Sequence, residues 1–126
     1  MPSICFYFEV HQPFRLNHFS VFNIGTTKDI HSTYFNSHLN QKIFEKVASK
    51  CYLPTNNLLL DLIRKYDGKF RVSYSLTGTF VEYCEKYIPE LLDSFKDLFQ
   101  TGAVDLIEET YFHSLSGLYD ELDEFE

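Results

Sequence analysis

Residues 5–13 read CFYFEVHQP, and this stretch decides the fold. Apolar and polar side chains alternate along it, which is the pattern of an extended strand with one buried face. The apolar face carries Ile4, Phe6, Phe8 and Val10. The opposite face carries Tyr7, Glu9 and His11, and Gln12-Pro13 ends the run. A strand over Ile4–His11 that ends in polar groups predicts a binding site for a polar ligand at that end.

Two further strands are expected, over Lys69–Thr77 and over the less regular stretch Ala103–Phe112. The first of these alternates strictly between apolar and polar side chains. All three expected strands end in polar groups: Glu9, His11 and Gln12; Ser75 and Thr77; Glu109, Thr110 and His113. If the strands are parallel, these polar ends meet at one edge of the sheet.

Helical patterns separate the strands. Residues 39–48 form one helix, and Pro54 opens a second that Gly68 ends. A short helix is expected over 79–86, and Pro89 opens a last helix that stops at Gly102. The second helix is expected to bury Leu58, Leu59, Leu62, Ile63 and Tyr66. The last is expected to bury Leu91, Leu92, Phe95, Leu98 and Phe99.

The order strand, helices, strand, helices, strand implies parallel strands with right-handed crossovers. Helices on one face and polar side chains on the other favour a slice of an α/β barrel over an open sheet, and barrels bind ligands at the C-terminal ends of their strands. Residues 14–38 form a polar and aromatic loop after the first strand. It is expected over the same rim, either as a functional loop or as an ordinary surface excursion.

Composition limits the class of protein. The 126 residues suit one domain, and 13 Phe and 9 Tyr suit a packed core. A net charge of -7 disfavours nucleic acid and anionic membrane surfaces as partners. There is no apolar run of membrane-spanning length and no secretion signal, and the cysteines Cys5, Cys51 and Cys84 lack CxxC spacing. We therefore expect a cytoplasmic protein with reduced, structural thiols.

Two regions carry a family resemblance. Residues 6–16, FYFEVHQPFRL, resemble the first signature region of glycoside hydrolase family 57, with its α-amylase-like branch as the best match. Residues 108–115, EETYFHSL, resemble the second region of that family. Residues 51–54 and 75–78 also resemble their counterparts, so the likeness extends over essentially the whole chain.

The resemblance implies an incomplete seven-stranded (β/α) barrel that acts on α-glucans with retention of configuration, with residues 1–126 as its first three strands. Its nucleophilic Glu and acid/base Asp belong to later signature regions, beyond the third strand. We therefore expect the N-terminal portion of an α-glucan hydrolase or 4-α-glucanotransferase. It would have no catalytic residue, metal or cofactor of its own and would be inactive when isolated.

The resemblance implies a wall of substrate-binding residues. His11 would hydrogen-bond sugar hydroxyls, and Gln12 would support the strand end or reach a hydroxyl. Glu109 would contact the sugar or a residue that does, and His113 would support it. Glu108 stands where the family usually has glycine.

Several alternatives remain open from the residues. Glu9 is expected to be a buried hydrogen-bond or ion-pair partner, with Arg71 as the candidate, although Glu9 and Glu109 are physically allowed as a catalytic pair. The two histidines and two glutamates of the strand ends would converge on a divalent metal in a deacetylase-like barrel, but no HxxxH or Asp-Asp pair supports this. A non-catalytic carbohydrate-binding remnant is the third reading.

Tyr111 would stack on sugar or pack in the core, and an exposed strand edge would allow self-association.

Overall fold

The computed structural model of the chain describes residues 4–26 and 28–115. Within them, β1 (Tyr7–Val10), β2 (Val72–Leu76) and β3 (Val104–Leu106) form one sheet in the order β1-β2-β3. Both pairings are parallel, with Tyr7 opposite Ser73 and Val72 opposite Val104. The predicted parallel α/β arrangement is confirmed.

The third strand is much shorter than the predicted Ala103–Phe112. Its ladder ends where the Ile107 N–H donates to the Tyr74 carbonyl at 2.7 Å. The chain then bends away from the sheet, because the Tyr111 carbonyl accepts a bond of 3.2 Å from the Thr79 N–H. Glu109 and His113 therefore lie in an irregular segment after β3 and not on a strand.

The chain is continuously helical from residue 37 to residue 65. It runs through α2 (Ser37–Val47), a π-helical segment η2 (Ala48–Tyr52) and α3 (Leu53–Lys65). Asn36 caps the start, where its side chain accepts from the Leu39 N–H at 2.9 Å. Pro54 lies in the first turn of α3, as predicted, but no loop precedes α3, because η2 joins it directly to α2. Wider π-type turns just before Pro54 accommodate a residue that lacks an N–H and crowds the preceding turn, so the helix continues.

The buried face of α3 is rotated relative to the predicted one. Leu58 is 58% exposed and Tyr66 is 49% exposed, whereas Asn56, Leu59 and Ile63 are buried. Asn56 is buried because its polar atoms have partners: its Nδ2 donates to Ser94 Oγ at 2.9 Å, and its Oδ1 accepts from the Tyr74 hydroxyl at 3.3 Å. Apolar spacing alone does not show such a satisfied polar position.

The last two helices agree with the predictions. α4 (Gly78–Tyr87) begins at Thr77, whose side chain accepts from the Phe80 N–H, and α5 (Pro89–Gln100) begins at its proline. Leu91, Phe95 and Leu98 of α5 are buried. Gly102 follows with a φ of 69°, a conformation that glycine adopts without strain.

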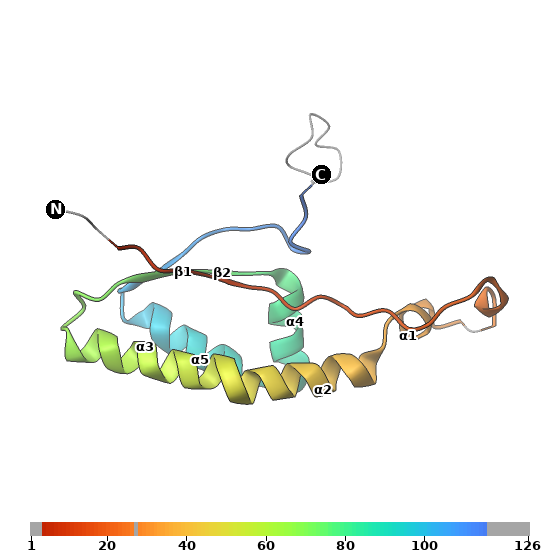
Figure 1. The fold of residues 1–126 in the computed structure, drawn as a ribbon, viewed down its shortest axis with the longest axis horizontal. Coiled ribbons are helices and arrows are strands. Elements are labelled where there is room, and N and C mark those ends of the chain that lie inside the picture. Colours follow the sequence, from red (N-terminus) through yellow and green to blue (C-terminus); the bar gives the residue numbers. More distant parts are fainter. Residues whose placement is uncertain (1–3, 27, 116–126) are drawn as a thin grey trace.

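All these helices lie on one side of the sheet (Figure 1). Between them and the strands is an aromatic core in which Phe44, Phe80 and Phe95 are at most 1% exposed. Phe80 packs edge-to-face on Phe95 with ring centroids 5.6 Å apart, and Phe95 packs in the same way on Tyr74 at 5.4 Å. Each buried aromatic side chain contributes about 2–3 kcal/mol. The core therefore fixes the sheet on one side and leaves its other face open to ligands.

Residues 14–26 and 28–36 extend along the long axis of the molecule beyond α4 (Figure 1). They include η1 (Val21–Asn23) and α1 (Ile30–Tyr34), and a bridge pairs Leu16 with Phe35. The loop begins at the end of β1, as predicted, but its outer part projects away from the strand ends. No helix among residues 4–26 and 28–115 is long and apolar enough to cross a bilayer. All three cysteines are free, and Cys84 is buried.

Candidate functional site

A chain of hydrogen bonds crosses the open face of the sheet. Ser75, which is fully buried, donates to a carboxylate oxygen of Glu109 through its hydroxyl. Because that hydroxyl has only one proton, the Tyr7 hydroxyl is the donor in its 2.8 Å bond with Ser75 Oγ. The relay from β1 through β2 holds Glu109, whose side chain is 12% exposed, against the sheet.

His113 connects this carboxylate to a second one. Its Nε2 lies 3.0 Å from Glu9 Oε1, and its Nδ1 lies 3.3 Å from Glu109 Oε1. A neutral imidazole donates to one of these carboxylates, whereas an imidazolium donates to both. The backbone aims the ring: His113 has a φ of 56° at the end of a turn in which its N–H donates to the Thr110 carbonyl at 3.1 Å. Such a conformation is uncommon for a residue other than glycine and occurs more often at functional sites.

His11 completes the group from the end of β1. Its ring centroid lies 5.0 Å from that of His113, and its Nδ1 is 3.1 Å from Thr77 Oγ1 and 3.5 Å from Thr79 Oγ1. Burial and the neighbouring His113 lower the pKa of His11, and the carboxylates of Glu109 and Glu9 offset this only in part. The imidazole of His11 is therefore predominantly neutral at neutral pH, with one nitrogen able to donate and one able to accept.

Of the four predicted site residues, the structure brings His11, Glu109 and His113 together, with Glu9 beside them. Gln12 lies apart from them. Its Nε2 donates to the Tyr52 hydroxyl at 2.8 Å, and its Oε1 accepts from Arg15 at 3.3 Å. Successive side chains of an extended segment point to opposite faces, so the residue after His11 points to the helices. Gln12 thus ties the strand end to η2, which is the supporting role predicted as one of its two options.

The expectation of a buried Glu9 paired with Arg71 is wrong on both points, because the Glu9 side chain is 46% exposed and Arg71 has another partner. Arg71 forms its ion pair with Asp105, at 3.2 Å, near the start of the sheet, while Glu9 contacts His113 near the strand end. Ser75 and Thr77 were expected at the polar end of their strand, and Tyr7 was expected on the polar face of the first strand. Thr79 was expected only as the start of a helix, because strand parity does not extend to it. We call Tyr7, Glu9, His11, Ser75, Thr77, Thr79, Glu109 and His113 the strand-end cluster.

The cluster is suited to neutral, hydroxyl-rich ligands. Carboxylates accept hydrogen bonds, imidazoles and hydroxyls donate and accept, and Glu9 remains 46% exposed at its side chain. Within residues 4–26 and 28–115, no group of three or more His, Cys, Asp or Glu side chains is arranged to hold a metal ion. Both imidazole nitrogens of His113 contact carboxylates, and Nδ1 of His11 contacts threonine hydroxyls.

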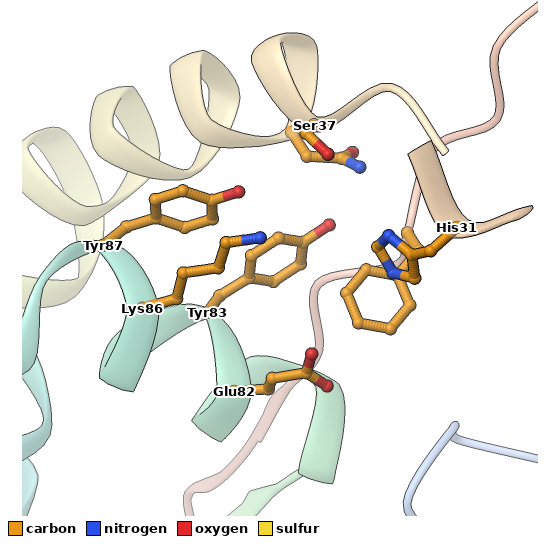
Figure 2. A pocket seen from close by; sticks show the side chains of 8 residues that line it. His31, Ser37, Glu82, Tyr83, Lys86 and Tyr87 are labelled. Atoms are coloured by element: carbon orange, nitrogen blue, oxygen red, sulfur yellow. The ribbon is translucent and has the colours of Figure 1, made fainter. Parts of the chain in front are cut away.

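An open groove of about 500 Å³ lies beside the cluster and is lined by Phe14, His31, Phe35, Glu82, Tyr111 and Phe112. Three of these residues also line a recess of about 10 Å³, which is the size of a single water molecule. In Figure 2, Tyr83, Lys86 and Tyr87 of α4 face Ser37 at the start of α2, and His31 stands on the far side of Tyr83. Of the two roles predicted for Tyr111, core packing does not hold, because its side chain lines the groove and the residue is 50% exposed.

Comparisons with known proteins agree with the resemblance. Residues 5–126 match the model of glycosyl hydrolase family 57. A protein of Methanocaldococcus jannaschii described as "Putative alpha-amylase" is 51% identical over 122 residues, which are 97% of this chain and 25% of that protein. The chain thus spans about a quarter of the length of the curated relative it matches. No solved structure matches the chain.

Proposed function

We propose, from the premise that this chain belongs to glycosyl hydrolase family 57, that its strand-end cluster binds the glucose units of an α-glucan. The observation that carries the proposal is the convergence of His11, Glu109 and His113 on the open face of a parallel sheet. They come from two segments about a hundred residues apart, and both segments resemble signature regions of the family.

The chemistry of the cluster fits a sugar. A glucose ring offers vicinal hydroxyls that both donate and accept, and Glu9 and Glu109 supply acceptors for the donated protons. The neutral His11 imidazole offers a donor or an acceptor without an ion's desolvation cost. Because Glu109 is held by Ser75 and His113 before a ligand arrives, little ordering is needed on binding.

The chain would contribute the substrate-binding wall of a partial (β/α) barrel and not its catalytic pair. In a retaining glycosidase two carboxyl groups about 5 Å apart face each other across the scissile bond. Glu9 and Glu109 do not fit this requirement, since the His113 ring lies between them and contacts both. The nucleophilic Glu and acid/base Asp would belong to later regions of an α-amylase or 4-α-glucanotransferase, as the resemblance implies.

Binding of maltohexaose to residues 1–126, measured by calorimetry with cellohexaose as the stereochemical control, tests the proposal. We expect binding of the α-linked glucan only. His11→Ala should weaken it by at least about tenfold, which is about 1.4 kcal/mol. The exposed His18 provides the matched control, and His18→Ala should change the affinity by less than about twofold. Absence of maltohexaose binding, or equal effects of the two variants, would contradict the proposal.

Catalysis is tested separately. Residues 1–126 should release no reducing sugar from starch or maltohexaose, because neither carboxylate of the cluster is arranged as a nucleophile. Release by protein of verified purity that is lost in Glu109→Gln would show that the cluster itself is catalytic.

A further inference from the structure

The ring of Tyr111 is fixed by three contacts from the first turn and a half of α4. The Thr79 N–H donates to the Tyr111 carbonyl at 3.2 Å, and the Tyr111 hydroxyl donates to Glu82 Oε2 at 2.9 Å. The ring itself lies against Gly78 so closely that any Cβ at position 78 would overlap it. Tyr111 is thus held through its carbonyl, through its hydroxyl and on one side of its ring, although the residue is half exposed. The ring is therefore in position before any ligand binds.

The surroundings of this ring combine apolar faces with polar groups. Phe14, Phe35 and Phe112 supply apolar lining of the groove, and Phe112 packs on Tyr111 with centroids 4.8 Å apart. Glu82 and His31 line both the groove and the water-sized recess, and Figure 2 shows them in the recess. A carboxylate accepts up to four hydrogen bonds, so Glu82 keeps capacity for ligand hydroxyls after accepting from Tyr111.

Thr79 connects Tyr111 of the groove to His11 of the strand-end cluster. The backbone N–H of Thr79 holds Tyr111, while its side-chain hydroxyl lies 3.5 Å from His11 Nδ1. Glu109 and His113, which belong to the cluster, flank Tyr111 in the same segment after β3. An extended ligand that reaches past the cluster in this direction would meet the Tyr111 ring next.

We propose that Tyr111, with Glu82 and His31 at the rim, forms a second glucose-binding subsite beside the strand-end cluster. The occupant is a neighbouring glucose unit of the same α-glucan, so this inference rests on the proposed function. The flat, C–H-rich face of a glucose ring packs on an aromatic ring, and its equatorial hydroxyls reach polar groups at the edge. A groove that served only an apolar partner would not need a carboxylate and an imidazole beside the platform.

A dependence of affinity on glucan length distinguishes the second subsite from the first. We would measure binding of maltose and maltohexaose to residues 1–126 and to three variants, each checked by circular dichroism. Tyr111→Leu removes the ring, and Gly78→Ala displaces it without changing its chemistry. Alanine is favoured over glycine within a helix, so Gly78→Ala should preserve α4. Tyr66→Leu is the matched control, because Tyr66 is 49% exposed at the end of α3, away from the groove.

We expect Tyr111→Leu and Gly78→Ala each to weaken maltohexaose binding by about tenfold and maltose binding by less than about twofold, with Tyr66→Leu unchanged. If the wild-type chain binds maltohexaose and His11→Ala abolishes this while Tyr111→Leu does not affect it, the subsite is disproved and the proposed function stands. If the wild-type chain binds neither glucan, both fail. If Tyr111→Leu converts a dimer to a monomer in sedimentation experiments without affecting glucan affinity, the groove is an interface between copies.

Discussion

Nε2 of His113 lies 3.0 Å from Oε1 of Glu9, so a residue of the segment after β3 is held against β1, the strand at the far edge of the sheet. The contact passes over β2 and closes the open face at one point. Segment 107–115 is also held by the His11–His113 ring contact and by bonds that Ile107, Glu109 and Tyr111 make to β2 and α4. The orientation of Glu109 and Tyr111 therefore depends on a few polar contacts near the proposed ligand.

His113→Ala should loosen this segment more than it destabilises the fold. Exposed ion pairs contribute about 0.2–1 kcal/mol, so the free energy of unfolding should fall by less than about 1 kcal/mol. Amide exchange of residues 107–115 should nevertheless accelerate severalfold, because the Glu9 and Glu109 contacts are both lost. His38→Ala on the exposed start of α2 is the control. Unchanged exchange of this segment would show that His113 does not fasten it.

Ser75→Ala should cost about 2 kcal/mol of stability in urea unfolding. The substitution removes a buried hydroxyl that donates to Glu109 and accepts from Tyr7, and hydrogen bonds to charged groups are stronger than neutral ones. Ser49→Ala, in the exposed part of η2, should change stability by less than about 0.5 kcal/mol. A Ser75→Ala chain as stable as the wild type would mean that the relay contributes nothing.

Asn56→Ala should destabilise the chain by about 2 kcal/mol, because the buried Tyr74 hydroxyl loses its acceptor. In the Asn56→Ala background, a further Tyr74→Phe substitution should be neutral or stabilising, whereas in the wild type it should cost about 1 kcal/mol. Asn57→Ala, one position away on the exposed face, serves as the control. Additive effects of the two substitutions would exclude the coupling.

Stability should decline as the pH falls below 6.5, the ordinary pKa of histidine. His11 has a lowered pKa in the folded chain, so between its folded and unfolded pKa values the unfolded state binds more protons, and acid favours unfolding. His113, Glu9 and Glu109 face the same ring and are unchanged in His11→Gln. The stability advantage of the wild type over His11→Gln should therefore be larger at pH 7.5 than at pH 5.5. An advantage that is constant or grows in acid would contradict the assignment to His11.

The chain should self-associate through the edges of its sheet. Phe6 is 50% exposed beside β1, and Leu106 is 58% exposed on β3. Apolar side chains beside unpaired strand edges favour association. Sedimentation velocity should show a mass that rises with concentration, and the double variant Phe6→Ser, Leu106→Lys should reduce it. A monomer of the wild-type chain at all concentrations would disprove this.

The spacing of apolar residues predicted the helices and strands that bury one face. The bounds and buried face of α5 agree with the prediction, since its apolar spacing and its start and stop residues, Pro89 and Gly102, indicate the same helix. Pro54 marked the first turn of α3 correctly, but the sequence did not show that π-helical turns join α3 to α2 without a loop. The burial of Asn56 could not be predicted from its neighbours in sequence, since its hydrogen-bond partners Ser94 and Tyr74 are distant along the chain.

Some members of the strand-end cluster could be predicted from the alternation of side chains along the strands. His11 and Glu9 share the polar parity of β1. Glu109 and His113 were expected at the polar end of the third strand, and the family resemblance supported both. Their mutual contacts were not predictable, because segment 107–115 leaves the sheet after β3 and its turn at His113 sets the direction of the imidazole. Charge alone favours Arg71 as the partner of Glu9, but Arg71 forms its ion pair with Asp105 on the neighbouring strand.

The order of the strands in the sheet also bears on how the chain reaches this structure. Val72 pairs with Val104 across a connection of about thirty residues, whereas Tyr7 pairs with Ser73 across more than sixty. Closing the longer loop costs more chain entropy and makes the contact slower to form. We therefore expect β2, α4, α5 and β3 to assemble first as a folding nucleus and β1 to join it last. The residue on which the proposed sugar contact most depends, His11, would then reach its place in the final step of folding.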